Sequence, residues 1–181
     1  MIKVWKAKKC LSSAPGADDW PVIKSTCIVD APPSSIADML MDSSKVHLTN
    51  KYSAGRDDAE KINGMSKICW NKIKLPFSLK PFDFCTLMHV YKSPGGQVMI
   101  ISKGIEHPKV PKQKDYARSD IIFGVNVLTP LKSDPKRTEL TSISHVRYAG
   151  IHPYLASANC LSGTTNYLRQ LKEVVLNAST K

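Results

Sequence analysis

The end of the chain carries one helical pattern that is far longer than any other in the sequence. Between residues 153 and 177, apolar and small residues recur at spacings of three and four. Proline stands at the expected first helical position. Such a helix would be roughly 37 Å long at about 1.5 Å per residue, so it could cross a whole sheet. The recurring residues are Leu155, Ala158, Leu161, Ser162, Thr165, Leu168, Leu171 and Val175.

The rest of the chain is mostly short strands separated by turn signals. Alternating or β-branched runs between turn residues predict strands, and Asn63-Gly64 is a strong hairpin signal. Proline near its start and apolar residues on one side predict a short helix at 33–41. No connection is long enough for repeated crossovers between parallel strands, so we expect an α+β fold with an antiparallel sheet. The predicted strands are 2–7, 20–29, 64–74, 82–91, 97–102, 117–129 and 139–148.

The residues in the middle of the predicted long helix are mostly small. Ala156, Ala158, Ser162, Gly163 and Thr164 follow one another closely there. Small residues in a covering helix either let it pack closely on the sheet or leave room beneath it, and this feature alone does not decide between the two.

Length and cysteine usage favour one domain without metal or disulfide support. The 181 residues suit a single domain, 1–181. The five cysteines never form a Cys-x-x-Cys pair, which predicts buried free thiols in a reducing compartment and no zinc site. No leader with an apolar core is expected at the start. The longest uncharged stretch, 148–168, is too polar for a membrane span.

The net charge of +11 indicates attraction to an anionic partner, either nucleic acid or an acidic membrane surface, or serves solubility alone, and charge by itself does not choose among these. The basic stretch 101–120 offers only Tyr116 as an aromatic partner for bases, so nucleic-acid binding is not expected. We interpret this stretch as a strand end, a proline-fixed turn and a strand start. Its lysines are then a solvated face or a docking surface for anionic bilayers; they are Lys103, Lys109, Lys112 and Lys114.

Four segments, in order, resemble the START domains, the steroidogenic-acute-regulatory-protein-related lipid-transfer domains. They are "VIKSTCIVDAPPSSIADMLMD", "LPFSLKPFDFCTL", "ISKGIEHPKVP…DYARSDIIFGVNVLTPL" and "ISHVRYAGIHPYLAS". The resemblance spans nearly the whole chain. It implies a helix-grip fold, in which a curved antiparallel sheet wraps a long C-terminal helix and an apolar tunnel encloses one lipid. It implies transfer without a catalytic residue. We also expect no cofactor and no metal, and a cytoplasmic protein, monomeric by default, that associates peripherally with membranes.

The chain departs from the family at two places. The family's usual N-terminal helix does not precede the first strand here, so it is either missing or supplied by sequence outside this chain. Phe82-Asp83 stands where relatives carry Arg-Asp, which puts sterol recognition in doubt and favours a phospholipid or a ceramide-like lipid. The resemblance implies polar ligand contacts at Asn71 and Ser102. The expected apolar wall residues are Phe82, Phe84, Met88, Ile100, Ile122, Leu155, Leu161, Thr165 and Leu168.

Two other functions stay open. The first is a grip-fold enzyme of the cyclase or hydrolase type, for which His145, Asp83 and Tyr148 are the candidate residues. The second is an interaction domain whose interior is filled by side chains. Arg118 matches the family's Tyr-x-Arg arginine, and we expect it to form a structural ion pair with Asp120 or Glu106.

Overall fold

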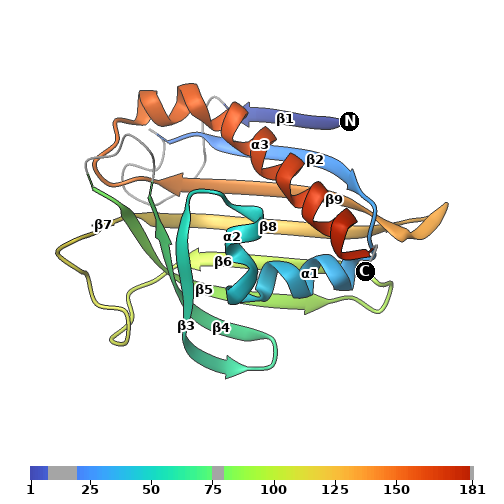
Figure 1. Cartoon of the computed structure of the whole chain (residues 1–181), viewed down its shortest axis with the longest axis horizontal. Helices are drawn as coiled ribbons and strands as arrows, with labels where there is room; N and C mark the ends of the chain where they lie inside the picture. The colour runs from blue at the N-terminus through green and yellow to red at the C-terminus, as the bar shows by residue number, and fades with distance from the viewer. Residues whose placement is uncertain (8–19, 75–79, 180–181) are drawn as a thin grey trace.

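The computed structural model describes residues 1–7, 20–74 and 80–179. Within them the chain forms a nine-stranded sheet, two α-helices that flank a 3₁₀ turn, and one long C-terminal helix (Figure 1). The elements are β1 (Ile2–Ala7), β2 (Val22–Val29), α1 (Pro33–Met41), η2 (Ser43–Lys45), α2 (Val46–Thr49), β3 (Ser53–Asn63), β4 (Ser66–Ile73), β5 (Phe82–Lys92), β6 (Val98–Gly104), β7 (Ala117–Arg118), β8 (Asp120–Leu131), β9 (Asp134–Arg147) and α3 (Pro153–Ser179).

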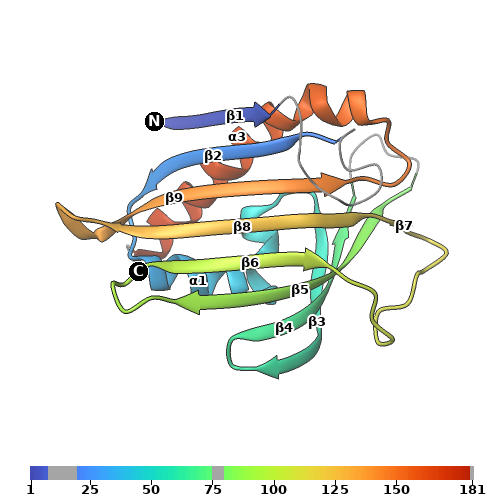
Figure 2. The ribbon, with the colours of Figure 1, turned by 180° about the vertical axis from the view of Figure 1, so that it is seen from behind.

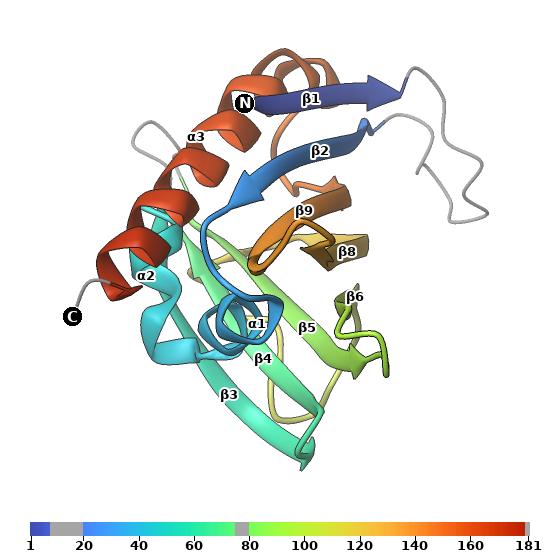
Figure 3. The same cartoon turned by 90° about the vertical axis from the view of Figure 1, so that its right-hand side faces the viewer.

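The sheet is antiparallel, curved and unclosed, which confirms the predicted α+β class. Its strands follow the order β1-β2-β9-β8-β6-β5-β4-β3, and only the short β7 pairs in parallel, with β5. Seen from the side, the sheet bends around α1 and α3, which both lie on its concave face (Figure 3). From behind, the described strands form one outer face that none of the three α-helices covers (Figure 2). We call the concave side the inner face.

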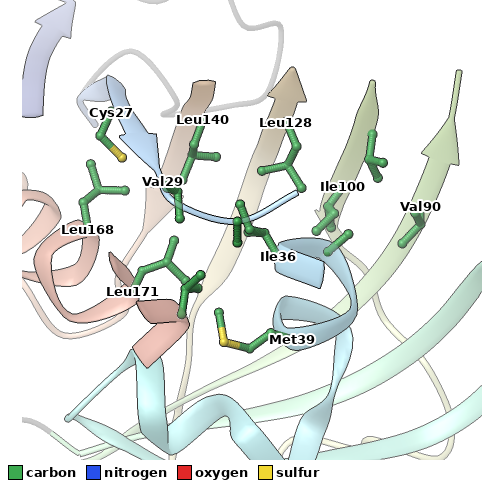
Figure 4. Packing of buried hydrophobic residues seen from close by; sticks show 14 of the residues in the cluster. Cys27, Val29, Ile36, Met39, Val90, Ile100, Leu128, Leu140, Leu168 and Leu171 are labelled. Atoms are coloured by element: carbon green, nitrogen blue, oxygen red, sulfur yellow. The ribbon is translucent and has the colours of Figure 1, made fainter. Parts of the chain in front are cut away.

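The register fixes which residues share the inner face. Leu140 pairs with Cys27 on one side and with Leu128 on the other, and Leu128 pairs with Val98. All four are buried together with Ile36 of α1 and with the C-terminal half of α3 (Figure 4). On β5 the two faces differ in their neighbours, because Met88 and Val90 belong to this cluster, whereas Cys85 packs in a second cluster outside it.

An ionic cluster fixes the end of α1 to the edge strands β3 and β4. The Lys67 ammonium donates to the carbonyl of Met41, to Ser43 Oγ at 2.9 Å and to Asp58 Oδ1 at 2.7 Å. Arg56 donates to the carbonyl of Leu40 at 2.8 Å. Cations stabilise the negative end of a helix dipole, so this cluster caps α1 at its C-terminus.

The sequence failed to predict β3, η2 and α2. In β3, charged residues occupy both faces from Arg56 to Lys61, which hides the strand alternation, and three register shifts interrupt its pairing with β4. Charges and bulges are typical of an edge strand that must not pair further. The predicted strand 117–129 is in fact β7 and β8, since Ser119 separates them.

The described cysteines are free thiols, as expected. Cys27, Cys69 and Cys85 are buried, and Cys160 is half-buried. Burial raises the pKa of the Cys69 thiol to about 11, so it stays protonated and packs as a small apolar group. Cys10 lies outside the described residues.

Candidate functional site

The two halves of α3 have different environments. Leu168 and Leu171, in the C-terminal half, are 0% exposed and pack on the core with Val175. In the N-terminal half, Leu155 is 55% and Leu161 40% exposed. At Gly163, an added Cβ would meet no atom within 4 Å. Leu168 and Leu171 of the C-terminal half therefore belong to the apolar core, whereas the two leucines of the N-terminal half lie outside it.

The N-terminal half of α3 is nevertheless tied to the edge of the sheet. The Lys6 ammonium of β1 donates to Ser157 Oγ at 2.9 Å. Before the helix, Gly150 adopts φ +77°, which only glycine takes without strain. None of the described residues in this half of α3 belongs to the apolar core. Its half-buried residues include the small Ala156, Ser157, Cys160 and Thr164.

Polar side chains occupy the inner face beside the apolar core. Moving along β9 from Leu140 toward Pro153, the next two inner residues are Ser142 and Ser144. The row of Ser142 runs from Ser25 to Asn126, and the row of Ser144 runs through Gly124 to Ser102. We call Ser25, Ser102, Asn126, Ser142 and Ser144 the Asn126 patch.

The side chains of the Asn126 patch form no hydrogen bond within the described residues. Four of its members are half-buried, and Ser25 is 1% exposed. Among the described buried side-chain nitrogens and oxygens, His107 Nδ1 alone lacks a partner, so the free polar atoms of the patch still face accessible space. Unpartnered hydroxyls and an amide below a loosely packed helix are what a bound polar group would satisfy.

Aromatic rings close the inner face at the end of β5. Phe82 and Phe84 both contact the ring of Tyr148, with centroids 5.9 Å and 6.1 Å away, and Trp20 contacts the same ring at 6.1 Å. Burial raises the pKa of the Tyr148 hydroxyl above its ordinary value. This aromatic cluster gives the inner face an apolar end wall.

Most of the predicted wall residues lie where the sequence placed them. Phe82, Phe84, Met88, Ile100 and Leu168 are buried, and the pairing puts them on the inner side. Whether any of them contacts a ligand stays a prediction.

The other four predicted wall residues differ from the expected packing. Leu155 and Leu161 are exposed and lie outside the apolar core. Ile122 is buried, but it sits at a bulge between Ile121 and Phe123, where simple alternation does not assign a face. Thr165 is half-buried and donates to the carbonyl of Leu161 in its own helix at 2.9 Å.

The two predicted polar contacts share the inner face, two strands apart. The Asn71 amide donates to Thr86 Oγ1 at 3.0 Å, so it is partly satisfied within the protein. Ser102 belongs to the Asn126 patch. Sequence reasoning missed the other four members. Val125, Val127 and Ile143 alternate with polar residues in the same strands, so they look like the inner residues although they lie on the outer face.

The predicted partner of Arg118 is wrong. Its guanidinium forms two hydrogen bonds with Asp83, at 2.9 Å and 2.8 Å, and donates to the carbonyls of Val110 and Pro111. Asp120 instead pairs with Arg147 at 3.1 Å, and Glu106 with Lys112 at 3.4 Å. Asp83 also accepts from Trp70 Nε1 at 2.8 Å, as expected of a carboxylate that satisfies donors in the sheet.

These contacts weaken the proposed catalytic set. Asp83 is 0% exposed and lies on the face of β5 opposite Phe82 and Phe84, whose rings contact Tyr148. The ring of His145 contacts the ring of Phe123, with centroids 5.6 Å apart. In the described residues, no group of three or more His, Cys, Asp and Glu side chains could hold a metal ion.

The basic stretch 101–120 forms the end of β6, an irregular segment, β7 and the start of β8. Several of its lysines have partners. Lys103 donates to the carbonyl of Ile122 at 2.6 Å, and Lys109 pairs with Glu60 at 2.8 Å. An open hollow of ≈ 660 Å³ lies beside the stretch, and two of the arginines that line it, Arg118 and Arg147, are already paired with acids.

Comparison with known proteins identifies the architecture. No family model and no curated protein sequence matches the chain. Among solved structures, human StAR-related lipid transfer protein 5 superposes with a TM-score of 0.85 at 16% identity, over 98% of this chain and 83% of that chain. Human STARD10 gives a TM-score of 0.82 at 18% identity, over 97% and 69%. A STAR-related lipid transfer protein from Xanthomonas axonopodis gives 0.79 at 15%, over 96% and 93%.

The chain has the fold of a START domain. This confirms the predicted helix-grip architecture, with α3 as the gripped helix. A more distant likeness exists to the Zhui aromatase/cyclase of Streptomyces, with a TM-score of 0.57 at 13% identity over 85% of this chain and 92% of that chain. No helix in the described part of the chain combines the length and apolar character that crossing a bilayer requires.

Proposed function

We propose that this START fold binds one lipid between the N-terminal half of α3 and the inner face of the sheet, and transfers it between membranes. The observation that carries the proposal is the uneven packing of α3, whose N-terminal half leaves leucines and inner-face polar groups unpacked. The structural neighbours named for lipid transfer share this fold over nearly the whole chain.

Apolar contact would supply the affinity. Burying a lipid tail contributes roughly 0.8 kcal/mol per CH₂ group, and the walls offered are Phe82, Phe84, Met88, Ile100 and Leu168. Leu155 and Leu161 would gain their burial only when a lipid or the sheet meets them. Loading then requires α3 to move, and Gly150 and Gly163 are its flexible points.

The polar group of the lipid would be selected by uncharged side chains, of which Asn71 and Ser102 are two. Phe82 is buried where an arginine would be needed for a cavity ion pair with an acid. A phospholipid or a ceramide-like lipid therefore fits the proposal better than a sterol held by such a pair.

Transfer requires transient contact with membranes, and the net charge of +11 favours anionic ones. Each Lys or Arg near an anionic surface contributes about 1 kcal/mol, so a few exposed lysines support docking without anchoring. We propose a monomer in the cytoplasm that associates peripherally with membranes. Liposome flotation that falls as salt is raised would support this part of the proposal.

Native mass spectrometry tests the binding step. We expect the purified protein, or the protein incubated with mixed liposomes, to carry one lipid per chain, which extraction then identifies. A Ser102→Trp variant should fill the inner face and lose the lipid, whereas Ile101→Trp, its exposed neighbour on the outer face, should keep it. A mass without lipid under every condition would contradict the proposal and favour an interaction domain with a filled interior.

An enzymatic function has one observation in its favour, the likeness to an aromatase/cyclase. We propose that the chain catalyses no reaction, because Asp83 is committed to Arg118 and Trp70. Turnover of a polyketide-like or ester substrate that vanishes in a His145→Ala variant would overturn this view.

A further inference from the structure

The Asn126 patch restricts the chemistry of the ligand's buried polar group. It presents one amide and four hydroxyls and contains no ionisable side chain. An amide can both donate and accept, and each hydroxyl can do either. The patch can therefore satisfy a hydroxyl, amide or ester, but it brings no charge to balance a phosphate or a carboxylate.

Three cations on the inner face of the described strands each have a partner. Lys6 lies in the row of Ser144, beyond Ile23, and its ammonium donates to Ser157 Oγ at 2.9 Å. Lys67 lies in the row of Ser102, beyond Met88, and its ammonium is used by Asp58, Ser43 and the Met41 carbonyl. Arg56, on the adjacent edge strand, donates to Ser43 and to the Leu40 carbonyl. A phosphate at the patch would have to take Lys6 from Ser157 or break the cap of α1, because burying an unpaired charge is far more costly than burying a hydroxyl.

Ser25 supplies an independent indication that the patch meets a ligand. Its side chain is 1% exposed, lies opposite Ser142 in the register, and forms no hydrogen bond within the described chain. A hydroxyl this deep in a protein is normally satisfied. Ser25 lies in the same row of paired residues as Asn126, whose side-chain amide also forms no hydrogen bond within the described chain.

We propose that the Asn126 patch is a binding site for an uncharged hydroxyl, amide or ester group of the lipid, with Asn126 as its central contact. This inference rests on the proposed function and names its ligand class. The lipid enters with this group against β8 and β9, and any phosphate it carries stays outside the patch. Lipids whose only polar group is uncharged then bind more tightly than the same lipids bearing a terminal phosphate.

Two matched lipid pairs test the assignment: dioleoylglycerol against dioleoyl phosphatidic acid, and ceramide against ceramide 1-phosphate. Competition for a lipid with a fluorescent tail measures each affinity. We expect the uncharged member of each pair to bind about tenfold more tightly, and Asn126→Leu to weaken its binding about tenfold, since removing one partner leaves the ligand's polar group unsatisfied. Thr141→Val, the neighbour of Ser142 on the outer face, is the control and should bind as the parent does.

Each remaining outcome has one meaning. Equal or tighter binding of the phosphate-bearing lipids, or unchanged affinity in both Asn126→Leu and the milder Ser142→Ala/Ser144→Ala variant, overturns the inference but leaves lipid binding intact. If Asn126→Leu does not fold, the affinity of the Ser142→Ala/Ser144→Ala variant decides the test. Failure of the parent protein to bind any of the four lipids overturns the proposed function itself.

Discussion

The two halves of α3 share one helix but not one role. Leu168, Leu171 and Val175 pack against α1 and the apolar rows of the sheet, so the C-terminal half builds the core. Leu155 and Leu161 in the N-terminal half remain exposed next to small residues. Apolar periodicity along the helix therefore builds the core at one end and leaves leucines exposed at the other.

Truncation of one leucine in each half should give the largest contrast. Leu171→Ala should lower the free energy of unfolding by about 3 kcal/mol, since it opens a cavity in a packed core. Leu161→Ala should change it by less than about 0.5 kcal/mol, because its side chain is not packed, yet it should weaken lipid binding. Urea denaturation and lipid competition measure the two effects. Equal destabilisation would show that both halves are packed alike.

The ionic cap of α1 belongs to the packed end and should matter next. Lys67→Met strands Asp58 and the Met41 carbonyl, so we expect a loss of about 2 kcal/mol. Lys72→Met is the matched control, because its partner Asp57 is largely exposed and such pairs contribute about 0–1 kcal/mol. Thermal unfolding of the two variants makes the comparison, and a larger effect at Lys72 would refute the assigned role.

Acid should loosen the same cap. Burial alone would raise the pKa of Asp58, but hydrogen bonds from Lys67 and Ser43 outweigh it and hold the pKa below its ordinary value. The stability from this carboxylate is thus complete above about pH 4, the unfolded value, and is lost as the pH falls through the lower folded value. Stability measured from pH 6 to pH 2 should fall less steeply in Asp58→Asn than in the parent. Identical slopes would exclude this contribution.

Stiffening the N-terminal half of α3 should have the smallest effect on stability. A Cβ at Gly163 has room, so Gly163→Ala should raise the free energy of unfolding by roughly 0.5–1 kcal/mol. We also expect slower lipid release, since the helix bends less easily. Gly64→Ala, in a hairpin turn with equal room, is the control and should leave release unchanged. Unaltered release in Gly163→Ala would mean that α3 does not flex there during exchange.

The sequence predicted those elements whose pattern is local. The first and last strands of the helix grip, α1 and the start of α3 follow from alternation, proline placement and helical spacing. β3 was missed because an edge strand with charged residues on both faces carries no alternation. The Arg118 partner was missed because Asp83 reaches it through the parallel pairing of β7 with β5, which no local pattern reveals.

The site was harder to predict than the fold because apolar residues lie on both faces of the central strands. Ile101 is 40% exposed on the outer face, while Ser102 faces inward beside Met88. Read from the sequence alone, Val125 and Val127 are better core candidates than Asn126. Only the register with Leu128 and Leu140 shows that the polar residues are the inner ones.

Photo-crosslinking of a bound lipid most directly tests where it lies. The protein would be loaded with a lipid that carries a diazirine in its tail, irradiated, and mapped by mass spectrometry of its peptides. The account predicts crosslinks to the N-terminal half of α3 and to inner-face residues of β5, β6, β8 and β9. Crosslinks confined to outer-face residues such as Ile101, or to the basic segment between β6 and β7, would contradict it.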